Sequence, residues 1–542
     1  MTAPAHAPVL VAFVVIVGVL LLFGLLAGSD GDDDLRSYYA AQARLTPLRG
    51  GLALAGDYVS AVTLLSTTGV IALAGFDGLS IALCSVLALG LLLLIAQPLR
   101  EAGRFTLGDV LARRLPGRAP RVAVGVATLA TTLPFLVVQL AGAGRVTAQL
   151  AGATGPGAQS ACIALIGCVM TCFAVAAGMR GTNAVQILKV FVVLAALAAT
   201  AAVLLAQFGR HPERLLTAAA RGSGRPDDYL RPGAYRGRGA VERLDFLSLQ
   251  LTAVLGGACM PHLTMRLGCA PDGATARRSA GVAVAVAGAV VATAAVLGLG
   301  AAALVGGPAI LRADPSGDAA LPLLAGRLGG GPASGAGAVL FTAVACAVFL
   351  TALAVVSALT LAAAAALAHD LHAHALRAGR LTEAREVRTA RWAVAATGLT
   401  GTALALAVHG SNTQFLATFA LTAAASSILP ATLGALFWPG FGRAGALWAL
   451  YGGLGCAVLL QALSPTVSGG PLALFPDRDF AWSPLVYPGV VSVPAGFLLA
   501  WAGSRFPGRT SRTSRTSRTG PGERARRGER TGRTGRPGRV PG

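Results

Sequence analysis

The chain carries about thirteen long apolar segments, each close to the length that a helix needs to cross a lipid bilayer. An α-helix rises 1.5 Å per residue, so about 20 apolar residues span the hydrocarbon layer. Backbone polar groups find no water there and must be bonded within the segment, which favours helices. The sequence therefore predicts an all-α integral membrane protein. The segments are 9–28, 50–74, 79–97, 122–150, 160–177, 183–208, 245–265, 280–305, 335–368, 392–408, 412–437, 443–463 and 484–503.

The composition agrees with a membrane protein, and much of the high positive charge comes from the C-terminal stretch. Hydrophobic residues make up 54% of the 542 residues and charged residues only 12%, which is too apolar for a soluble fold with one core. The net charge of +21 could suggest nucleic-acid binding, but twelve arginines follow Ser504, in a stretch rich in Gly, Pro, Ser and Thr. We expect a membrane domain over residues 1–503. Residues 504–542 are predicted to form a disordered tail that contacts anionic lipids rather than nucleic acid.

The arginines of the short connections predict the orientation, because positive charge stays on the cytoplasmic side. The short connections after Gly75, Ala151 and His409 hold no arginine. We therefore expect a multi-pass protein of the plasma membrane with its N-terminus outside and its C-terminus in the cytoplasm. The first segment is read as a retained helix rather than a signal peptide. The arginines on the inner side are Arg36, Arg44 and Arg49; Arg100, Arg104, Arg113, Arg114, Arg118 and Arg121; and Arg377, Arg380, Arg385, Arg388 and Arg391.

One aspartate, Asp57, lies inside the second apolar segment, in LALAGDYVSAVTLL. A charged side chain at the bilayer centre costs about 2.5 to 3.5 kcal/mol on insertion scales, so it usually faces water, a partner or a cavity. Two interpretations stay open. Asp57 could lie at the cytoplasmic edge of the helix, or the helix could be interrupted near Gly56, so that its free carbonyl groups coordinate a cation.

A second segment with features of an interrupted helix supports the second interpretation. Leu247–Gly268 contains Gly256 and Gly257 at its centre, with Pro261 and His262 beyond. The two segments are the second and seventh helices, which is the spacing of a five-plus-five inverted repeat. We expect the two core repeats to cover about residues 50–208 and 245–437.

Several polar residues near these two segments are candidates for binding an anionic substrate. A break at Gly256 and Gly257 would offer free backbone N–H groups to an anion. Ser60, Gln139 and Gln250 could add hydrogen bonds. The alternatives are a serine bonded to its own helix and amides that only join two helices.

Other polar residues inside the apolar runs have simpler explanations. Lys189 is the only lysine of the chain and is expected at the cytoplasmic interface, with a gate or substrate contact as the alternative. Arg145 is expected to reach the outer surface, and His262 is expected to be structural.

The residues also resemble a known family, the sodium:solute symporters, and within it the cation/acetate (monocarboxylate) permeases. The resemblance implies a LeuT-type transporter of thirteen helices that couples inward cation movement to uptake of a short monocarboxylate. The matching stretches occur in the family's order from about residue 35 to 500: GLALAGDYVSAVTLL, GFDGLS, REAGRFTLGDVLARRL, QLAGAGRVTAQL, AGMRGTNAVQILKV, GGACMPHLTMR and LTLAAAAALAHDL.

The resemblance also implies positions for the coupling cation. Ala55 and Tyr58 match residues whose carbonyl groups line the family's sodium site, and Asp57 matches an aspartate that is important for coupling. The two adjacent hydroxyl ligands of sodium-coupled relatives fall on Ala354 and Val355, which have no side-chain oxygen. The nearest hydroxyl groups belong to Thr351, Ser357 and Thr360. Losing two oxygen ligands weakens a sodium site, so the coupling ion is Na⁺ or H⁺, with Asp57 as the titrating group in the second case.

No sequence motif indicates an enzyme, a cofactor or a bound metal. The chain has no Walker loop, no HExxH motif and no GxSxG nucleophile. The sequence predicts a secondary active transporter that works by alternating access. A solute sensor or scaffold that binds without transport is the alternative, and the sequence gives no oligomeric state.

Overall fold

The computed structural model describes residues 11, 14, 15, 18, 19, 22–27, 34–150, 156–233, 239–328, 335–408, 414–470 and 473–506. Most of the first apolar segment and nearly all of the arginine-rich tail lie outside these residues. In the described ranges the chain is helical, and its one β-type pairing is an isolated bridge between Ser468 and Phe475. The all-α prediction is confirmed.

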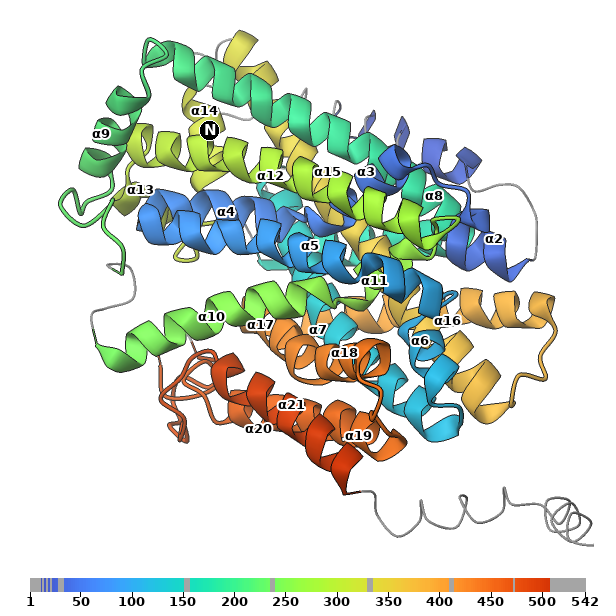
Figure 1. The fold of residues 1–542 in the computed structure, drawn as a ribbon. Coiled ribbons are helices and arrows are strands. Elements are labelled where there is room, and N and C mark those ends of the chain that lie inside the picture. The colour runs from blue at the N-terminus through green and yellow to red at the C-terminus, as the bar shows by residue number, and fades with distance from the viewer. Residues whose placement is uncertain are drawn as a thin grey trace, which may run out of the picture.

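Within the described part of the chain, nine helices are long and apolar enough to cross a membrane, and the bent pair α3–α4 makes a tenth. The helix α8 has 52 residues, which would extend about 78 Å if straight, and it is interrupted at Gly178. We therefore count α8 as two spans. The long helices lie side by side in one bundle (Figure 1). They are α5 (Phe76–Ala102), α7 (Arg118–Leu150), α8 (Pro156–Gln207), α10 (Ala240–Ala258), α12 (Gly273–Leu304), α15 (Gly335–Ala365) and α16 (Glu383–Val408).

Shorter helices complete these spans or connect them. The π-helical segments η4, η5 and η6 continue α15, α17 and α19. The remaining elements are α2 (Leu35–Ala40), η2 (Ala41–Ala43), α3 (Pro47–Tyr58), α4 (Ala61–Ala74), α6 (Leu107–Arg114), α9 (Pro212–Gly222), α11 (Pro261–Leu267), α13 (Gly307–Ala313), α14 (Ala320–Arg327), η4 (Ala366–Leu376), α17 (Gln414–Ala423), η5 (Ala424–Ile428), α18 (Leu429–Phe437), α19 (Arg443–Leu447), η6 (Trp448–Gly452), α20 (Gly453–Ala462) and α21 (Gly489–Arg505).

The order of the spans repeats after five. The first set is α3–α4, α5, α7 and the two parts of α8, and the second set is α10–α11, α12, α15, α16 and α17–α18. Each set begins with a helix that is broken in two. The helices α19, α20 and α21 lie together along one side of the bundle (Figure 1).

The centre of the bundle is formed by α15, which is buried from Val344 to Ala365. Small residues let neighbouring helices approach closely, which is how helices pack where water provides no driving force. At Gly51 of α3, for example, an added Cβ would lie 2.4 Å from the Cβ of Val282 on α12. The broken helix α3–α4 packs against α12 and α15, and α3 also packs against α8.

The connections between spans gather at two opposite ends of the bundle, which we call the α6 end and the α9 end (Figure 1). At the α6 end, Arg100 Nε donates to the carbonyl of Ala270 at 2.8 Å, and Arg114 donates to that of Ala435 at 3.2 Å. At the α9 end, the backbone N–H of Phe76 donates to Tyr229 at 3.1 Å. The connections that contain residues 100–121 and 377–391 both lie at the α6 end, where Arg121 bonds to Asp370.

Candidate functional site

The first break separates α3 from α4 and bends this span by 62°. Val59 and Ser60 are extended between the two helices, and the N–H of Val59 donates to Ala55 at 2.9 Å as the last bond of α3. The break therefore begins at Val59, three residues beyond Gly56, the position near which the sequence predicted it. The reason is that Ser60 caps α4, whereas Gly56 fits inside α3 against Gln186.

Ser60 and Thr63 form a reciprocal capping box that frees two carbonyl groups. The N–H of Ser60 donates to Thr63 Oγ1 at 2.7 Å, and the N–H of Thr63 donates to Ser60 Oγ at 3.0 Å. In a continuous helix these two N–H groups would close on the carbonyls of Gly56 and Val59, four residues earlier. Both carbonyls are left to accept from another partner.

That partner is Lys189 on the second part of α8. Its ammonium group donates to the carbonyl of Gly56 and, at 2.9 Å, to that of Val59. The side chain is fully buried, so the expectation that Lys189 lies at the membrane interface is wrong. The predicted carbonyl ligand Ala55 is satisfied within α3, and the carbonyl of Tyr58 accepts from Thr63 at 3.5 Å. The freed pair is thus offset by one residue from the predicted pair.

Asp57 lies wholly inside the protein and points to α11 and α8. Arg266 of α11 binds both of its carboxylate oxygens, with Nη2 2.6 Å from Oδ1. Gln186 of α8 donates to Oδ1 at 2.6 Å, and Arg266 also donates to Asn183. The alternative that placed Asp57 at the watery edge of the helix is wrong. A bidentate arginine and an amide compensate its charge instead.

Three polar residues of α8, Asn183, Gln186 and Lys189, supply the partners of the first break and of Arg266. They recur every three residues and therefore share one face of the helix. The sequence alone predicted no role for Asn183 and Gln186. Their spacing in an otherwise apolar helix was the signal that could have identified them.

The hydroxyl groups of α15 that were predicted to bind the cation are bonded to their own helix. Thr351 donates to Val348, Ser357 to Ala354 at 2.9 Å, and Thr360 to Val356 at 2.7 Å. The link from α15 to the first break is instead a carbonyl group, because Gln186 also donates to Ala354 at 2.9 Å.

The second break lies at Cys259 and Met260, between α10 and α11, and not at Gly256 and Gly257. Met260 is extended because the residue before a proline avoids the helical region, and Pro261 begins α11. Gly256 lies in the last turn of α10, where an added Cβ would be 2.1 Å from the carbonyl oxygen of Leu421. An added Cβ on Gly257 would be 3.4 Å from the hydroxyl oxygen of Tyr58, so this glycine faces the first broken helix.

Polar atoms of α7 and α11 lie beside the first break. Gln139 of α7 donates to Ser60 at 3.3 Å, and its Oε1 has no hydrogen-bond partner among the described residues. His262 of α11 is buried, stacks on Phe135 with ring centroids 6.2 Å apart, and has an Nδ1 without a partner in the same ranges. Phe135 and Gln139 are one turn apart on α7. Gln250, in contrast, donates to Ser80 at 3.0 Å and joins α10 to α5.

With Lys189 protonated, the three buried charges at the breaks, those of Asp57, Arg266 and Lys189, sum to +1. A free metal cation on the carbonyls of Gly56 and Val59 would lie next to the ammonium group of Lys189. Two like charges 4 Å apart repel by about 4 kcal/mol at an effective dielectric constant of about 20. The ammonium group and a metal cation therefore exclude one another from these carbonyls, whereas the surplus charge attracts a monovalent anion.

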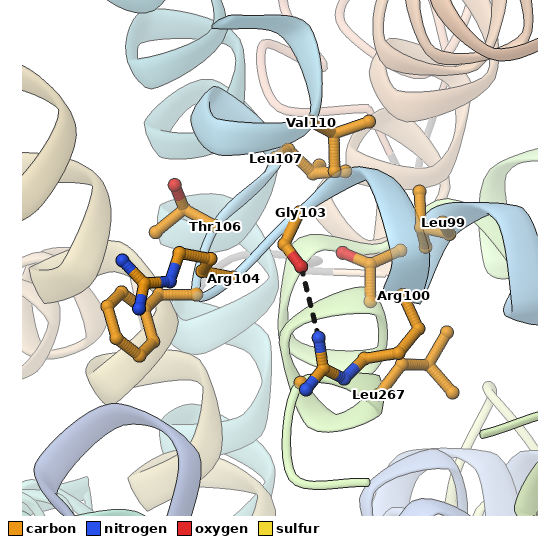
Figure 2. Close-up of a pocket in the computed structure, with 11 residues that line it drawn as sticks. Leu99, Arg100, Gly103, Arg104, Thr106, Leu107, Val110 and Leu267 are labelled. Carbon is orange, nitrogen blue, oxygen red and sulfur yellow. Dashed lines mark hydrogen bonds between the residues drawn. The ribbon is translucent and has the colours of Figure 1, made fainter. Parts of the chain in front are cut away.

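A small pocket lies between the end of α11 and the α5–α6 connection, at the α6 end (Figure 2). Its lining includes Thr264 and Leu267, which flank Arg266 along α11, and the two basic residues Arg100 and Arg104. In Figure 2, Arg100 donates to the carbonyl of Gly103, at 3.4 Å. The pocket brings positive charge close to the broken helix α10–α11 at the α6 end.

A second charged group of residues, at the α6 end, joins four helices. Arg121 bonds to Asp109 at 3.1 Å and to Asp370 at 3.3 Å, while His369 bonds to Glu386 at 2.6 Å and to Asp109 at 3.1 Å. Although burial opposes ionisation, the hydrogen bond and charge of His369 hold the pKa of the Asp109 carboxyl well below its usual range. Asp109, His369 and Asp370 have the geometry for a metal ligand set, but both carboxylates already bind the guanidinium group of Arg121.

Comparisons with known proteins agree with this architecture. A model of the sodium:solute symporter family matches residues 38–453. The monocarboxylic acid transporter of Corynebacterium glutamicum is 37% identical over 504 residues, which cover 91% of this chain and 90% of that protein. The uncharacterized symporter YwcA of Bacillus subtilis is 36% identical over 501 residues, with 91% and 93% covered.

Among solved structures, a substrate-bound, outward-open Na⁺-coupled sialic acid symporter superposes with a TM-score of 0.68. It covers 93% of this chain and 98% of its own, at 12% sequence identity, so the likeness concerns the fold. The predicted LeuT-type, five-plus-five architecture is confirmed. The number of thirteen helices stays a prediction, because the described residues include only part of the first segment.

Proposed function

The chain belongs to the sodium:solute symporter family, and from this premise we propose that it carries acetate or a similar short-chain monocarboxylate into the cell. Cation-coupled solute symport is the activity to which the family assigns it. The family and the relatives are transporters, not enzymes, and the chain is a multi-pass membrane protein. The choice of a monocarboxylate rests on the name of the Corynebacterium glutamicum relative and on the charge at the breaks.

One observation carries the proposal: the two broken helices α3–α4 and α10–α11 meet around a buried charge of +1. The bond from Arg266 to Asp57 connects them, and Lys189 adds the second positive charge. A site of this charge suits a monovalent anion, and fixed donors in a buried site replace the water that the carboxylate loses.

We assign the binding of the substrate carboxylate to Ser60, Gln139 and His262. Ser60 and Gln139 are already within hydrogen-bond distance of each other, and both Gln139 and His262 retain a buried polar atom without a partner in the described ranges. Gly257 has no side chain that could fill the region next to these residues, where it faces Tyr58. Gly256 and Gln250 fix the position of α10, Gly256 by its close packing against Leu421 and Gln250 by its bond to Ser80.

For the cation, we propose the region of Ala55, Asp57 and Tyr58 at the end of α3, where a metal cation could bind the carbonyl groups of Gly56 and Val59 only if Lys189 moved away from them. Thr351 and Ser357 on α15 could join only by turning away from their own helix. The coupling ion is Na⁺, which the family name implies, or H⁺.

We place the α6 end in the cytoplasm, which puts the N-terminus outside and the C-terminus inside, in the plasma membrane. Arg100, Arg114 and Arg121, from the stretch that joins α5 to α7, make their contacts at this end, as the positive-inside rule requires of a cytoplasmic side. The pocket with Arg100 and Arg104 would then receive the anion as it leaves the breaks (Figure 2). The tail beyond residue 504 would lie on anionic lipids of the same side.

Uptake by the purified protein in liposomes tests the function. Radiolabelled acetate and pyruvate are supplied under an imposed Na⁺ or pH gradient, and uptake by protein-free liposomes is subtracted because neutral acetic acid crosses lipid. Accumulation above the external concentration, driven by either gradient, supports the proposal. Saturable binding without accumulation under any gradient would contradict it and would favour a sensor.

A further inference from the structure

The only lysine of the chain occupies the carbonyl pair at the first break. Of the 44 lysine and arginine residues, all but Lys189 are arginines. Arginine stays protonated in proteins, whereas a lysine ammonium can lose its proton when it is buried. The one basic side chain able to change its charge by releasing a proton, apart from histidine, is therefore bonded to the break of a transporter helix.

Lys189 holds this position in place of a free cation. Its ammonium group accounts for both carbonyls that the Ser60–Thr63 capping box releases, those of Gly56 and Val59. Removing the proton would leave an amine that can no longer donate to both carbonyls as strongly. The charge of Lys189 is thus linked to the position of the α3 end relative to α8.

Building on the proposed function, we propose that Lys189 binds and releases the coupling proton, so that one proton enters with each monocarboxylate. In the outward-facing state the neutral amine takes a proton from external water and the anion binds. In the inward-facing state the ammonium group gives this proton to internal water and the anion leaves. No other ion is needed to balance the step.

The other charged groups that face Lys189 suit this role. Asp57 of α3 and Arg266 and His262 of α11 act electrostatically with Lys189, and α15 contains no charged residue. Asp57 is bound by Arg266 and Gln186, so its protonation would leave two buried positive charges without a counter-ion. This makes Lys189, and not Asp57, the group that changes charge.

The sum of charges then predicts electroneutral transport. With the proton and the anion both bound, Asp57, Arg266, Lys189 and the substrate sum to zero. With both released, Asp57 and Arg266 also sum to zero. The two states that cross the membrane barrier therefore carry the same charge, and the membrane potential should not drive the cycle.

The test uses the full-length protein in liposomes with pyruvate, whose acid crosses lipid less readily than acetic acid. An inwardly directed proton gradient should drive accumulation in the wild type, while a Na⁺ gradient or a potassium diffusion potential should change the rate less than twofold. An entrapped pH dye should report one proton per pyruvate. Accumulation that follows the Na⁺ gradient and ignores the pH gradient would overturn the inference while leaving monocarboxylate transport intact.

Two substitutions of Lys189 distinguish the loss of the exchangeable proton from a loss of folding. Lys189→Arg keeps the positive charge but not the exchangeable proton, so net uptake should fall at least tenfold while exchange of internal for external pyruvate continues. Lys189→Gln removes the charge and should lose both. Net proton-driven uptake by Lys189→Arg at the wild-type rate would refute the inference. If neither variant folds, the dye stoichiometry of the wild type decides, and a value of zero refutes it. A wild type that accumulates no monocarboxylate under any gradient would instead refute the proposed function.

Discussion

Replacing Asp57 by asparagine removes the only negative charge from the group at the breaks and leaves Arg266 and Lys189 buried without a counter-ion. Removing one partner of a buried ion pair costs about 3 to 5 kcal/mol. Asparagine keeps an oxygen that can accept from Arg266 and Gln186, and Arg266 keeps its bond to Asn183, so the lower end applies. We expect Asp57→Asn to lower the free energy of unfolding by about 3 kcal/mol.

A double-mutant cycle tests whether this loss comes from the uncompensated charge. Arg266→Gln alone leaves Asp57 with Gln186 and the nearby Lys189, and the double variant removes both charges of the pair. If the reasoning holds, the double variant should be more stable than the sum of the single effects predicts, by roughly 1 to 3 kcal/mol. Equilibrium unfolding in mixed detergent–SDS micelles measures each stability.

Transport gives a second readout for the same substitution. Gradient-driven uptake by Asp57→Asn should be lost even where the variant is folded, because the site's charge changes from +1 to +2. Asp227→Asn, at an exposed position of the α9 end, is the matched control and should behave as the wild type. A free energy of unfolding of Asp57→Asn within about 1 kcal/mol of the wild-type value, together with the same uptake rate, would show that the charge of Asp57 is not needed to compensate Arg266 and Lys189.

Three further predictions concern Ser60 at the first break, Gly257 of α10 and Asp318 at the α9 end. Ser60→Ala removes the cap of α4 and should cost about 1 kcal/mol of stability and reduce uptake, whereas Ser60→Thr should retain both, as unfolding and uptake assays will tell. Gly257→Leu should lower the uptake rate at least tenfold, because its Cβ alone would lie 3.0 Å from Ala88, while Gly288→Leu, with nothing within 4 Å, should not. Burial raises the pKa of Asp318 to about 6 from 3.8, so its neutral form is favoured in the folded protein. Asp318→Asn should therefore be more stable than the wild type at pH 7, with the gain falling as the pH drops below about 6 and disappearing below about pH 4 in thermal unfolding; an equal gain at pH 7 and at about pH 3.5 would contradict this sign.

Local sequence patterns were enough to predict the helical architecture. Apolar length alone set the spans, because a lipid-exposed backbone must bond within its own segment. The two interrupted helices were also found, but each break was displaced. Glycine suggested the positions, whereas the true signals were the Ser60–Thr63 cap and the effect of Pro261 on Met260.

The candidate site was predicted only in part, because its contacts join residues that are far apart in the chain. Asp57 was recognised as unusual, but its partners Gln186 and Arg266 lie 129 and 209 residues away. The hydroxyl groups of Thr351 and Ser357 fit the chemistry of a cation site, yet α15 satisfies them with its own carbonyls. A sequence tells which groups can donate or accept, and packing decides which of them meet.

Lys189 illustrates this division most clearly. Its sequence position, early in an apolar segment, favours the membrane surface, because a long side chain can reach water from there. The fold instead places this part of α8 against the end of α3, where two carbonyls lack helical partners and accept from the buried ammonium group. The sequence determined that these helices form and where polar groups interrupt them. Only the tertiary structure decided which buried charges face one another, since that depends on how helices remote in sequence pack together.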